Sequence, residues 1–231
     1  MLKRSFIVSE QSKDFLAKFF PEASYEDWNN WHWQLKNRFS NFKSLSKLIN
    51  LSVDEMKFFT DKVKHLPLKI TPYYASLIDN SKQDDPIRKS VVPVFQEYHV
   101  HAEEMVDPLG EEHDNPVPCI VHRYPDRVLF LTTNFCSTNC RYCTRSRLVN
   151  RPDNHLSNLE IHEKAIQYIK ENTQIRDVLL SGGDPLTLPD ERLNYLLSNI
   201  AKKEEMQKYL SELESGLFNI EQAMFAANFV D

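Results

Sequence analysis

Three cysteines lie close together in the segment Cys136-Ser-Thr-Asn-Cys140-Arg-Tyr-Cys143. The C-x3-C-x2-C spacing lets three thiolates converge on one soft metal centre. Three thiolates are one too few for a closed four-iron cluster, so one iron would keep an open position for a ligand. The alternative is a structural zinc site completed by a distant histidine such as His122. Zinc sites usually use paired C-x2-C hooks, and only one such pair is present, so the spacing favours an iron–sulfur centre. The remaining cysteine, Cys119, is expected to be a buried small hydrophobe.

A second unusual loop contains Gly182 and Gly183, followed by Asp184, in a chain that has only 4 glycines. A sequence that avoids glycine and then uses two in succession needs an unusual backbone there. The loop could let the backbone approach a ligand closely. The alternative is a tight turn between a strand and a helix, with no ligand.

The elements around both loops are expected to form an α/β sheet. Residues 128–133 form an apolar run of strand length, and residues 157–171 carry apolar positions at helical spacing. A second buried strand is expected at 177–181 and another helix from Asp190. Strand, helix, strand, helix at this spacing predicts a parallel sheet. Ligands bind at the C-terminal ends of such strands, which is where both loops fall.

The preceding part of the chain is expected to be helical and then irregular. Ser24 with Asp27 and Ser52 with Glu55 match capping boxes. Prolines between residues 66 and 125 predict an arm of short helices and extended pieces. The apolar residues that follow the first box should share one face of a single helix: Trp28, Trp31, Leu35 and Phe39.

Composition excludes several classes of protein. The 231 residues include 28 basic and 33 acidic side chains, a net charge of −5, which argues against a nucleic-acid binder that relies on a basic surface. The hydrophobic share of 41% and the aromatic share of 11% predict a sizeable core. The longest apolar run is too short to cross a membrane, and the N-terminus lacks a secretory signal. Clustered cysteines indicate a reducing compartment, so a cytoplasmic location is expected.

Taken together, the motifs resemble the radical S-adenosylmethionine superfamily and, within it, the lysine 2,3-aminomutase family. The resemblance implies an α/β fold: the start of a partial (β/α) barrel at 127–200, after a helical N-terminal region at 1–126 and before a helical tail at 201–231. It extends roughly over residues 24–200. The segments that carry it are residues 28–34, 70–74, 85–89, 118–129, 143–145 and 177–184.

The resemblance implies a radical isomerase that moves an amino group from C2 to C3 of an amino acid, with L-lysine to L-β-lysine as the expected reaction. The implied cofactors are a 4Fe-4S cluster, S-adenosylmethionine and pyridoxal phosphate, which supply the difficult chemistry. The implied partners are a small amino acid substrate and a reducing electron donor, with a homo-oligomer left open and neither nucleic acid nor membrane expected.

The same resemblance assigns residues, none of them as catalytic. Cys136, Cys140 and Cys143 would bind the cluster, and Arg145 would receive the substrate carboxylate. Cys119 departs from the family pattern, where glycine is expected, which leaves the local turn geometry open. The residues implied in cofactor binding are Tyr142, Ser181, Gly182, Gly183 and Asp184 for S-adenosylmethionine, and Arg123, Tyr124 and Arg127 for pyridoxal phosphate.

The resemblance ends after Ile200. Apolar residues of the tail recur at helical spacing, which predicts an amphipathic helix that covers an unfinished core or pairs two chains. The family's pyridoxal-binding lysine lies in a glycine-rich segment that has no counterpart here, so we expect a truncated chain that does not turn over an amino acid alone. The open alternatives are a relic, non-catalytic iron–sulfur fragment, or an aminomutase for glutamate, arginine or a lysine on elongation factor P.

Overall fold

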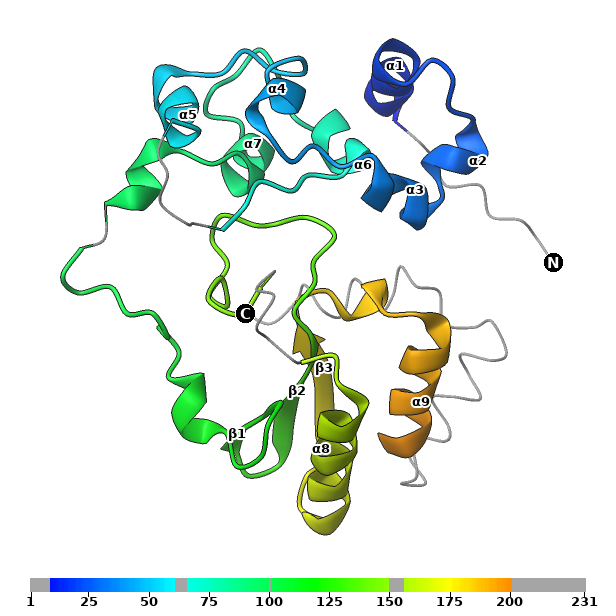
Figure 1. Cartoon of the computed structure of the whole chain (residues 1–231), viewed down its shortest axis with the longest axis vertical. Helices are drawn as coiled ribbons and strands as arrows, with labels where there is room; N and C mark the ends of the chain where they lie inside the picture. Colours follow the sequence, from blue (N-terminus) through cyan, green and yellow to red (C-terminus); the bar gives the residue numbers. More distant parts are fainter. Residues whose placement is uncertain (1–8, 61–65, 100, 150–155, 201–231) are drawn as a thin grey trace. The chain divides into compact units, whose positions relative to one another are not determined.

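The structure is a computed structural model that describes residues 9–60, 66–99, 101–149 and 156–200. It divides into two compact units (Figure 1): the first contains residues 1–109 and 135–154, and the second contains residues 110–134 and 155–231. The cysteine loop belongs to the first unit and the Gly-Gly loop to the second. The predicted divisions at residues 126 and 200 stay predictions, and the tail that begins at residue 201 lies outside the described residues.

The first unit is built from short helices. Each α-helix has a side-chain cap at its start, and α6 and α7 also begin with proline, whose fixed φ suits the first turn. The described helices of this unit are α1 (Glu10–Phe19), α2 (Tyr25–Trp28), α3 (Trp31–Lys36), α4 (Phe42–Leu45), α5 (Val53–Phe58), α6 (Pro72–Ser76), α7 (Pro86–Val91) and the 3-10 helix η1 (Phe95–Tyr98).

Both predicted capping boxes are confirmed, at the starts of α2 and α5. The prediction of one helix from Ser24 to Phe39 is wrong. The side chain of Asn30 accepts hydrogen bonds from the amides of His32 and Trp33 and so starts a second helix, α3. The face is therefore split: Trp28 is 3% exposed and Trp31 is 40% exposed. Phe39 instead pairs with Ile70 through two backbone hydrogen bonds of 2.9 and 3.1 Å.

A buried ion pair joins α5 to α7. Arg88, 1% exposed, donates from Nε and Nη2 to the carboxylate of Glu55 at 2.8 and 2.6 Å. Nη2 also donates to the carbonyl oxygen of Asn50 at 2.8 Å. Glu55 in turn accepts a hydrogen bond from the amide of Ser52, so one carboxylate both caps α5 and fixes α7.

The second unit contains a three-stranded mixed sheet in the order β1-β2-β3. β1 (Ile120–Tyr124) pairs antiparallel with β2 (Arg127–Thr133), and β2 pairs parallel with β3 (Asp177–Gly182). The parallel β2–β3 pair confirms the predicted alternation of strands and helices; β1 was not anticipated. The other described elements are η2 (Glu111–Asp114), α8 (Leu159–Glu171), η3 (Pro185–Thr187) and α9 (Asp190–Ile200). A closed or partial barrel stays a prediction.

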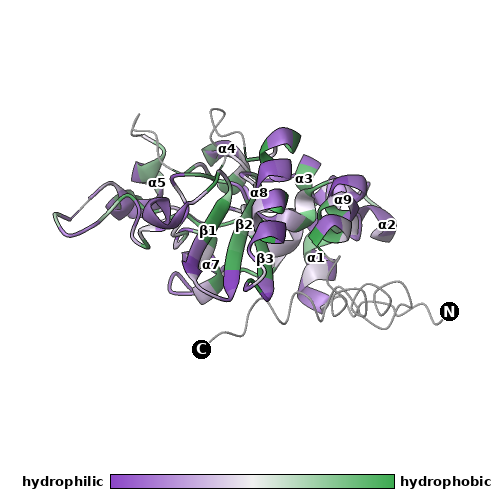
Figure 2. Cartoon of the chain, turned by 90° about the horizontal axis from the view of Figure 1, so that it is seen from below, coloured by the Kyte–Doolittle hydropathy of each residue, from purple (hydrophilic) through white to green (hydrophobic). Residues whose placement is uncertain are grey.

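The core of this unit is built around β2. Phe130 is fully buried and Val128 and Leu131 are nearly so, which fits the hydrophobic colouring of the strands in Figure 2. β3 was expected to be buried too, but Leu179 is 56% exposed, and burial alternates along the strand because successive side chains point to opposite faces of the sheet. Helices α8 and α9 contact each other. Across the described part of the chain, no helix combines the length and apolarity that crossing a membrane requires.

Candidate functional site

The cysteine loop begins directly after β2 along the chain and is held to the first unit by residues that lie between the cysteines. Asn139, 1% exposed, donates from its amide to the carbonyl oxygen of Lys69 at 2.9 Å and from Nδ2 to that of Pro67 at 2.8 Å. The amide of Arg141 donates to the carbonyl oxygen of Ser90 at 2.8 Å. The cysteine loop lacks regular secondary structure, so its backbone amides donate to carbonyl oxygens of the segment before α6 and of the end of α7.

Arg141 is part of this anchoring. Its side chain pairs with Glu97, donates from Nη1 to the carbonyl oxygen of Leu66 at 3.0 Å, and lies over the ring of Phe58. With 7% of its side chain exposed, it is a structural residue of the loop.

Cys136, Cys140 and Cys143 are not joined in disulfides and are half-buried. The amide of Cys143 donates to the carbonyl oxygen of Cys140 at 3.3 Å, so these two form one turn. Burial raises the pKa of the Cys143 thiol, and a bound metal would remove that proton. No group of three or more metal-binding side chains is gathered among the described residues. As a donor set, three thiols on an anchored loop fit an iron–sulfur cluster, and their assignment stays a prediction.

Two further predicted residues lie on the same loop. Tyr142 is 71% exposed, and the negative charge of Cys140, followed by the hydrogen bond that the hydroxyl donates to that residue, raises the pKa of the hydroxyl. An exposed ring beside the thiols is available to a planar ligand. Arg145 is half-buried, and its carbonyl oxygen accepts from the amides of Leu148 and Val149 in the turn that closes the loop. The structure places Tyr142, Arg145 and the thiols on one anchored segment.

The Gly-Gly loop is tied to the end of β2. Gly182 has φ of 109°, and a Cβ there would lie 2.3 Å from the carbonyl oxygen of Thr133. The amide of Gly183 donates to that same oxygen at 2.6 Å. The unusual backbone that the sequence predicted is therefore present, and packing between strands already accounts for Gly182 without a ligand.

Ser181 and Asp184 flank the pair. The hydroxyl of Thr132 donates to the carbonyl oxygen of Ser181 at 3.3 Å. A side-chain oxygen of Asp184 accepts from the amide of Leu186 at 3.2 Å and so caps η3. Both residues therefore have structural partners at the carboxyl end of β3.

Cys119, at the position where we expect glycine from the family resemblance, has φ of 72°. The amide of Ile120 donates to the carbonyl oxygen of Val117 at 3.1 Å, which makes a turn with Pro118 second and Cys119 third. Type II turns favour proline at the second position and require positive φ at the third. Cys119 therefore occupies the position of this turn that favours glycine, and burial raises the pKa of its thiol to about 12.

The residues predicted to contact pyridoxal phosphate lie at the other end of the sheet from the Gly-Gly loop. Arg127 faces Asp177 at the start of the parallel pair, while Gly182 faces Thr133 at its end. At about 3.3 Å per residue these positions are roughly 20 Å apart.

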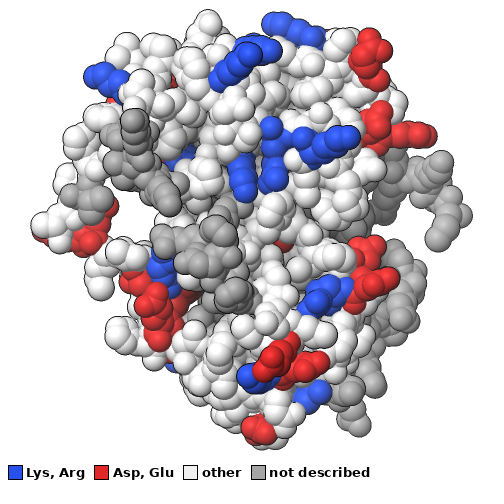
Figure 3. Space-filling view, in the orientation of Figure 1, with Lys and Arg blue, Asp and Glu red and all other residues white. Residues whose placement is uncertain are grey.

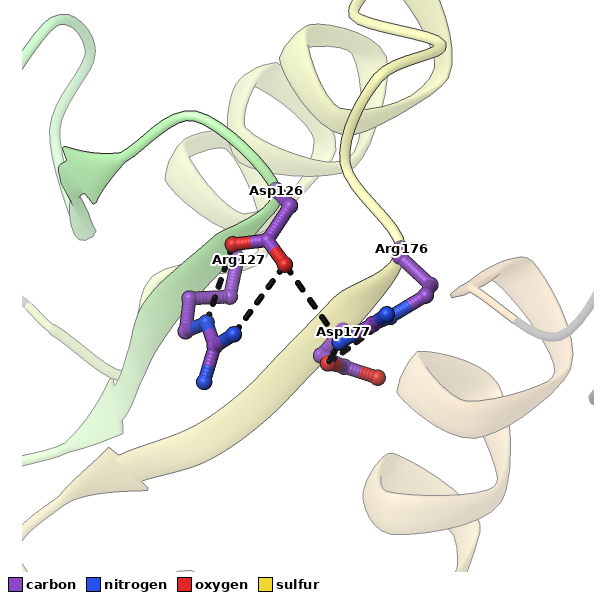
Figure 4. A network of polar contacts seen from close by, with 4 residues as sticks. All are labelled: Asp126, Arg127, Arg176 and Asp177. Atoms are coloured by element: carbon purple, nitrogen blue, oxygen red, sulfur yellow. Dashed lines mark hydrogen bonds and ion pairs between the residues drawn. The ribbon is translucent and has the colours of Figure 1, made fainter.

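The two arginines of this group already have anionic partners. Arg123 pairs with Asp114 at 2.7 Å. Arg127 pairs with Asp126, whose carboxylate also contacts Arg176 (Figure 4). These ion pairs are partly exposed to solvent, and the assignment of Arg123, Tyr124 and Arg127 to pyridoxal phosphate stays a prediction.

His122, the histidine considered for a zinc site, shares a 2.7 Å hydrogen bond between its Nδ1 atom and the hydroxyl of Tyr168 on α8. Two residues that sequence reasoning missed are Arg38 and Lys69, which lie over the ring of Phe135 next to Cys136. They are far from the loop in sequence and belong to no motif, so only folding brings them to it.

Comparison with known proteins identifies relatives of the segment that contains the two loops. The family model of the Radical SAM superfamily matches residues 130–218. The chain is 46% identical over 183 residues to the L-lysine 2,3-aminomutase of Acetoanaerobium sticklandii, covering 79% of this chain and 44% of the relative. It is 45% identical to that of Fusobacterium nucleatum, covering 79% and 43%. It is 44% identical over 175 residues to the glutamate 2,3-aminomutase of Clostridioides difficile, covering 76% and 41%.

The chain thus spans less than half the length of these curated relatives. The matched portion contains the cysteine loop and the Gly-Gly loop, the two features that resembled this group in sequence. The chain therefore belongs to the radical S-adenosylmethionine superfamily and, within it, to the lysine 2,3-aminomutase family, whose N-terminal part it matches.

Proposed function

We propose that this chain carries the cluster-binding and S-adenosylmethionine-binding part of a 2,3-aminomutase, with L-lysine as the substrate that is converted to L-β-lysine. Cys136, Cys140 and Cys143 would hold a 4Fe-4S cluster whose fourth iron stays open to S-adenosylmethionine. When bound, these groups would supply the radical that starts the rearrangement. Tyr142 would stack on the adenine, and Arg145 would bind the substrate carboxylate through its planar fork.

One observation carries the proposal. The amide of Gly183 is hydrogen bonded to Thr133, only three residues before Cys136 along the chain. The two loops thus leave neighbouring parallel strands at their carboxyl ends, the position at which α/β folds bind ligands. Glycine at position 182 allows the end of β3 to come this close to the end of β2, because any side chain there would collide with the carbonyl oxygen of Thr133.

The roles of Arg123, Tyr124 and Arg127 toward pyridoxal phosphate rest on the family resemblance alone. The glutamate 2,3-aminomutase among the relatives keeps glutamate as the second candidate substrate. A relic iron–sulfur fragment is the alternative without turnover. These proposals differ in product and can be separated by one assay.

The experiment is anaerobic reconstitution with iron and sulfide. We expect 4Fe-4S absorption and a reduced-state EPR signal that changes when S-adenosylmethionine is added. Cys136→Ala, Cys140→Ala and Cys143→Ala should each abolish the cluster, whereas Cys119→Ala should keep it. Stoichiometric zinc without cluster uptake, or a spectrum indifferent to saturating S-adenosylmethionine, would contradict the proposal.

The reconstituted protein is then incubated with dithionite, S-adenosylmethionine and either lysine or glutamate. We expect 5′-deoxyadenosine from this chain, and the β-amino acid that forms, if one does, identifies the substrate. An intact cluster that yields neither product would favour the relic fragment.

A further inference from the structure

Two cations lie over one aromatic ring at the start of the cysteine loop. The guanidinium carbon of Arg38 is 4.8 Å from the ring centroid of Phe135, and the Nζ atom of Lys69 is 5.4 Å from it. Both contacts lie within the roughly 6 Å range of cation–π attraction. Phe135 directly precedes Cys136, so the ring holds two positive charges at the residue before the first of the three cysteines.

Arg38 also holds the backbone of this thiol. Its Nη1 atom donates to the carbonyl oxygen of Cys136 at 3.0 Å and reaches that of Ser137 at 3.5 Å. Its Nε atom donates to the carbonyl oxygen of Leu35 at 3.0 Å, at the end of α3. The guanidinium therefore links α3 to the cysteine loop.

Lys69 is joined to the same loop by its own backbone, because its carbonyl oxygen accepts from the amide of Asn139. Its side chain is half-buried beside Arg38, and burial together with the charge of Arg38 lowers the pKa of its amine. The charge of Cys136 opposes this shift.

Two like charges that share one half-buried ring repel each other, so an anion beside them would be stabilised. A cluster held by three thiolates is such an anion, and it becomes more negative by one unit on reduction. Figure 3 shows Lys and Arg side chains, together with some Asp and Glu side chains, on the face drawn over the helices of this unit. A fixed cation next to a redox centre favours the reduced, more negative state.

We propose that Lys69 and Arg38 are positioning residues of the iron–sulfur centre, which hold Cys136 and raise the reduction potential of the cluster through their charge. The inference rests on the proposed function, because it requires the cluster. In this proposal Lys69 raises the reduction potential through its charge. Arg38 does the same and also holds the carbonyl groups of Cys136 and Ser137 by hydrogen bonds.

The test is an EPR-monitored redox titration of the reconstituted protein without S-adenosylmethionine. We expect Lys69→Met to lower the equilibrium constant for one-electron reduction about tenfold, or about 59 mV for a one-electron couple. Lys69→Arg keeps the charge and should keep the potential. The matched control is Lys47→Met, which removes the same charge from an exposed position between α4 and α5.

Arg38→Lys provides a second measurement. It keeps a cation at the ring but loses the guanidinium fork, so the reduction potential should stay the same while the release of iron to a chelator becomes about threefold faster.

Equal reduction potentials for Lys69→Met and Lys47→Met would overturn the electrostatic role of Lys69. If Lys69→Arg lowered the reduction potential as much as Lys69→Met, side-chain packing and not charge would explain the effect. If the unaltered protein takes up no cluster, the proposed function fails first and this inference with it.

Discussion

Cys119 shows how far a single backbone angle constrains the residue that can occupy it. Its φ of 72° lies in the left-handed region, where a side chain collides with the following carbonyl group at a cost of about 1–2 kcal/mol. The side chain is nevertheless 3% exposed and packs in the core. The turn between Val117 and Ile120 therefore tolerates cysteine only by storing strain that glycine would not have.

We predict that Cys119→Gly is more stable than Cys119→Ala by about 1 kcal/mol, because both lose the thiol but only glycine relieves the strain. The measurement is the urea midpoint of each variant. The reverse order would mean that the turn adopts another geometry in solution.

At the scale of elements, the join between β2 and β3 depends on Gly182. An added Cβ would lie 2.3 Å from the carbonyl oxygen of Thr133, a contact that the parallel pair cannot relieve without moving a strand. Among the described glycines, φ is positive at Gly110 and Gly182 but not at Gly183. The two adjacent glycines therefore carry different constraints.

We predict that Gly182→Ala destabilises the second unit by about 2 kcal/mol or more, through strain and overpacking. Gly183→Ala, the matched control, should cost less than half of that. Hydrogen exchange of the β2 and β3 amides measures both. Similar losses in the two variants would show that the approach to Thr133 does not set the glycine requirement.

The link between α5 and α7 is electrostatic and buried. Glu55 has a lowered pKa: burial acts to raise it, but the hydrogen bonds from Arg88 and Ser52 and the charge of Arg88 outweigh burial. Removing one residue of such a pair leaves the charge of the other uncompensated in the interior.

We predict that Glu55→Gln costs about 3 kcal/mol of unfolding free energy in the first unit, because Arg88 stays buried without its anion. Replacing both residues, as Glu55→Gln with Arg88→Met, should cost less than Glu55→Gln alone. The exposed pair of Glu10 and Lys13 provides the control, since Glu10→Gln should leave stability nearly unchanged. Denaturant titrations decide between these outcomes.

At the scale of the whole molecule, the two units contain different acid-sensitive groups. His162 of the second unit is fully buried, its Nε2 atom contacts the carbonyl oxygen of Leu156, and its ring meets Phe130 edge to face. Burial and, to a lesser extent, the charge of Arg192 lower its pKa, while hydrogen bonds to backbone groups oppose the shift. Folding thus favours the neutral imidazole.

For a histidine with a lowered folded pKa, the stabilisation is complete above the unfolded value of 6.5 and is lost as the pH falls below it. For Glu55, the corresponding loss begins only below 4.5. We therefore predict that, between pH 7 and pH 5, amides of β2 and α8 lose protection against hydrogen exchange while those of α5 and α7 keep it. His162→Gln should remove most of this difference. Equal losses in both units would contradict the assignment.

Those parts of the fold whose signals are local could be predicted from the amino-acid sequence. The capping boxes of α2 and α5, the strands β2 and β3 and the helices α8 and α9 follow from side-chain spacing and local hydrogen bonding. The family was also readable, because short motifs such as the cysteine loop keep their residue types and spacing.

Only the structure revealed the rest. The break between α2 and α3 and the hairpin of β1 with β2 arise from local contacts that the sequence reading missed. The half-exposed face of β3 depends on partners that are distant in sequence. The placement of Arg38 and Lys69 over Phe135, and of Arg123 and Arg127 at the far end of the sheet from Gly182, follows from long-range contacts. The physical reason is that spacing reports which face of an element a residue occupies, whereas packing decides what lies opposite that face.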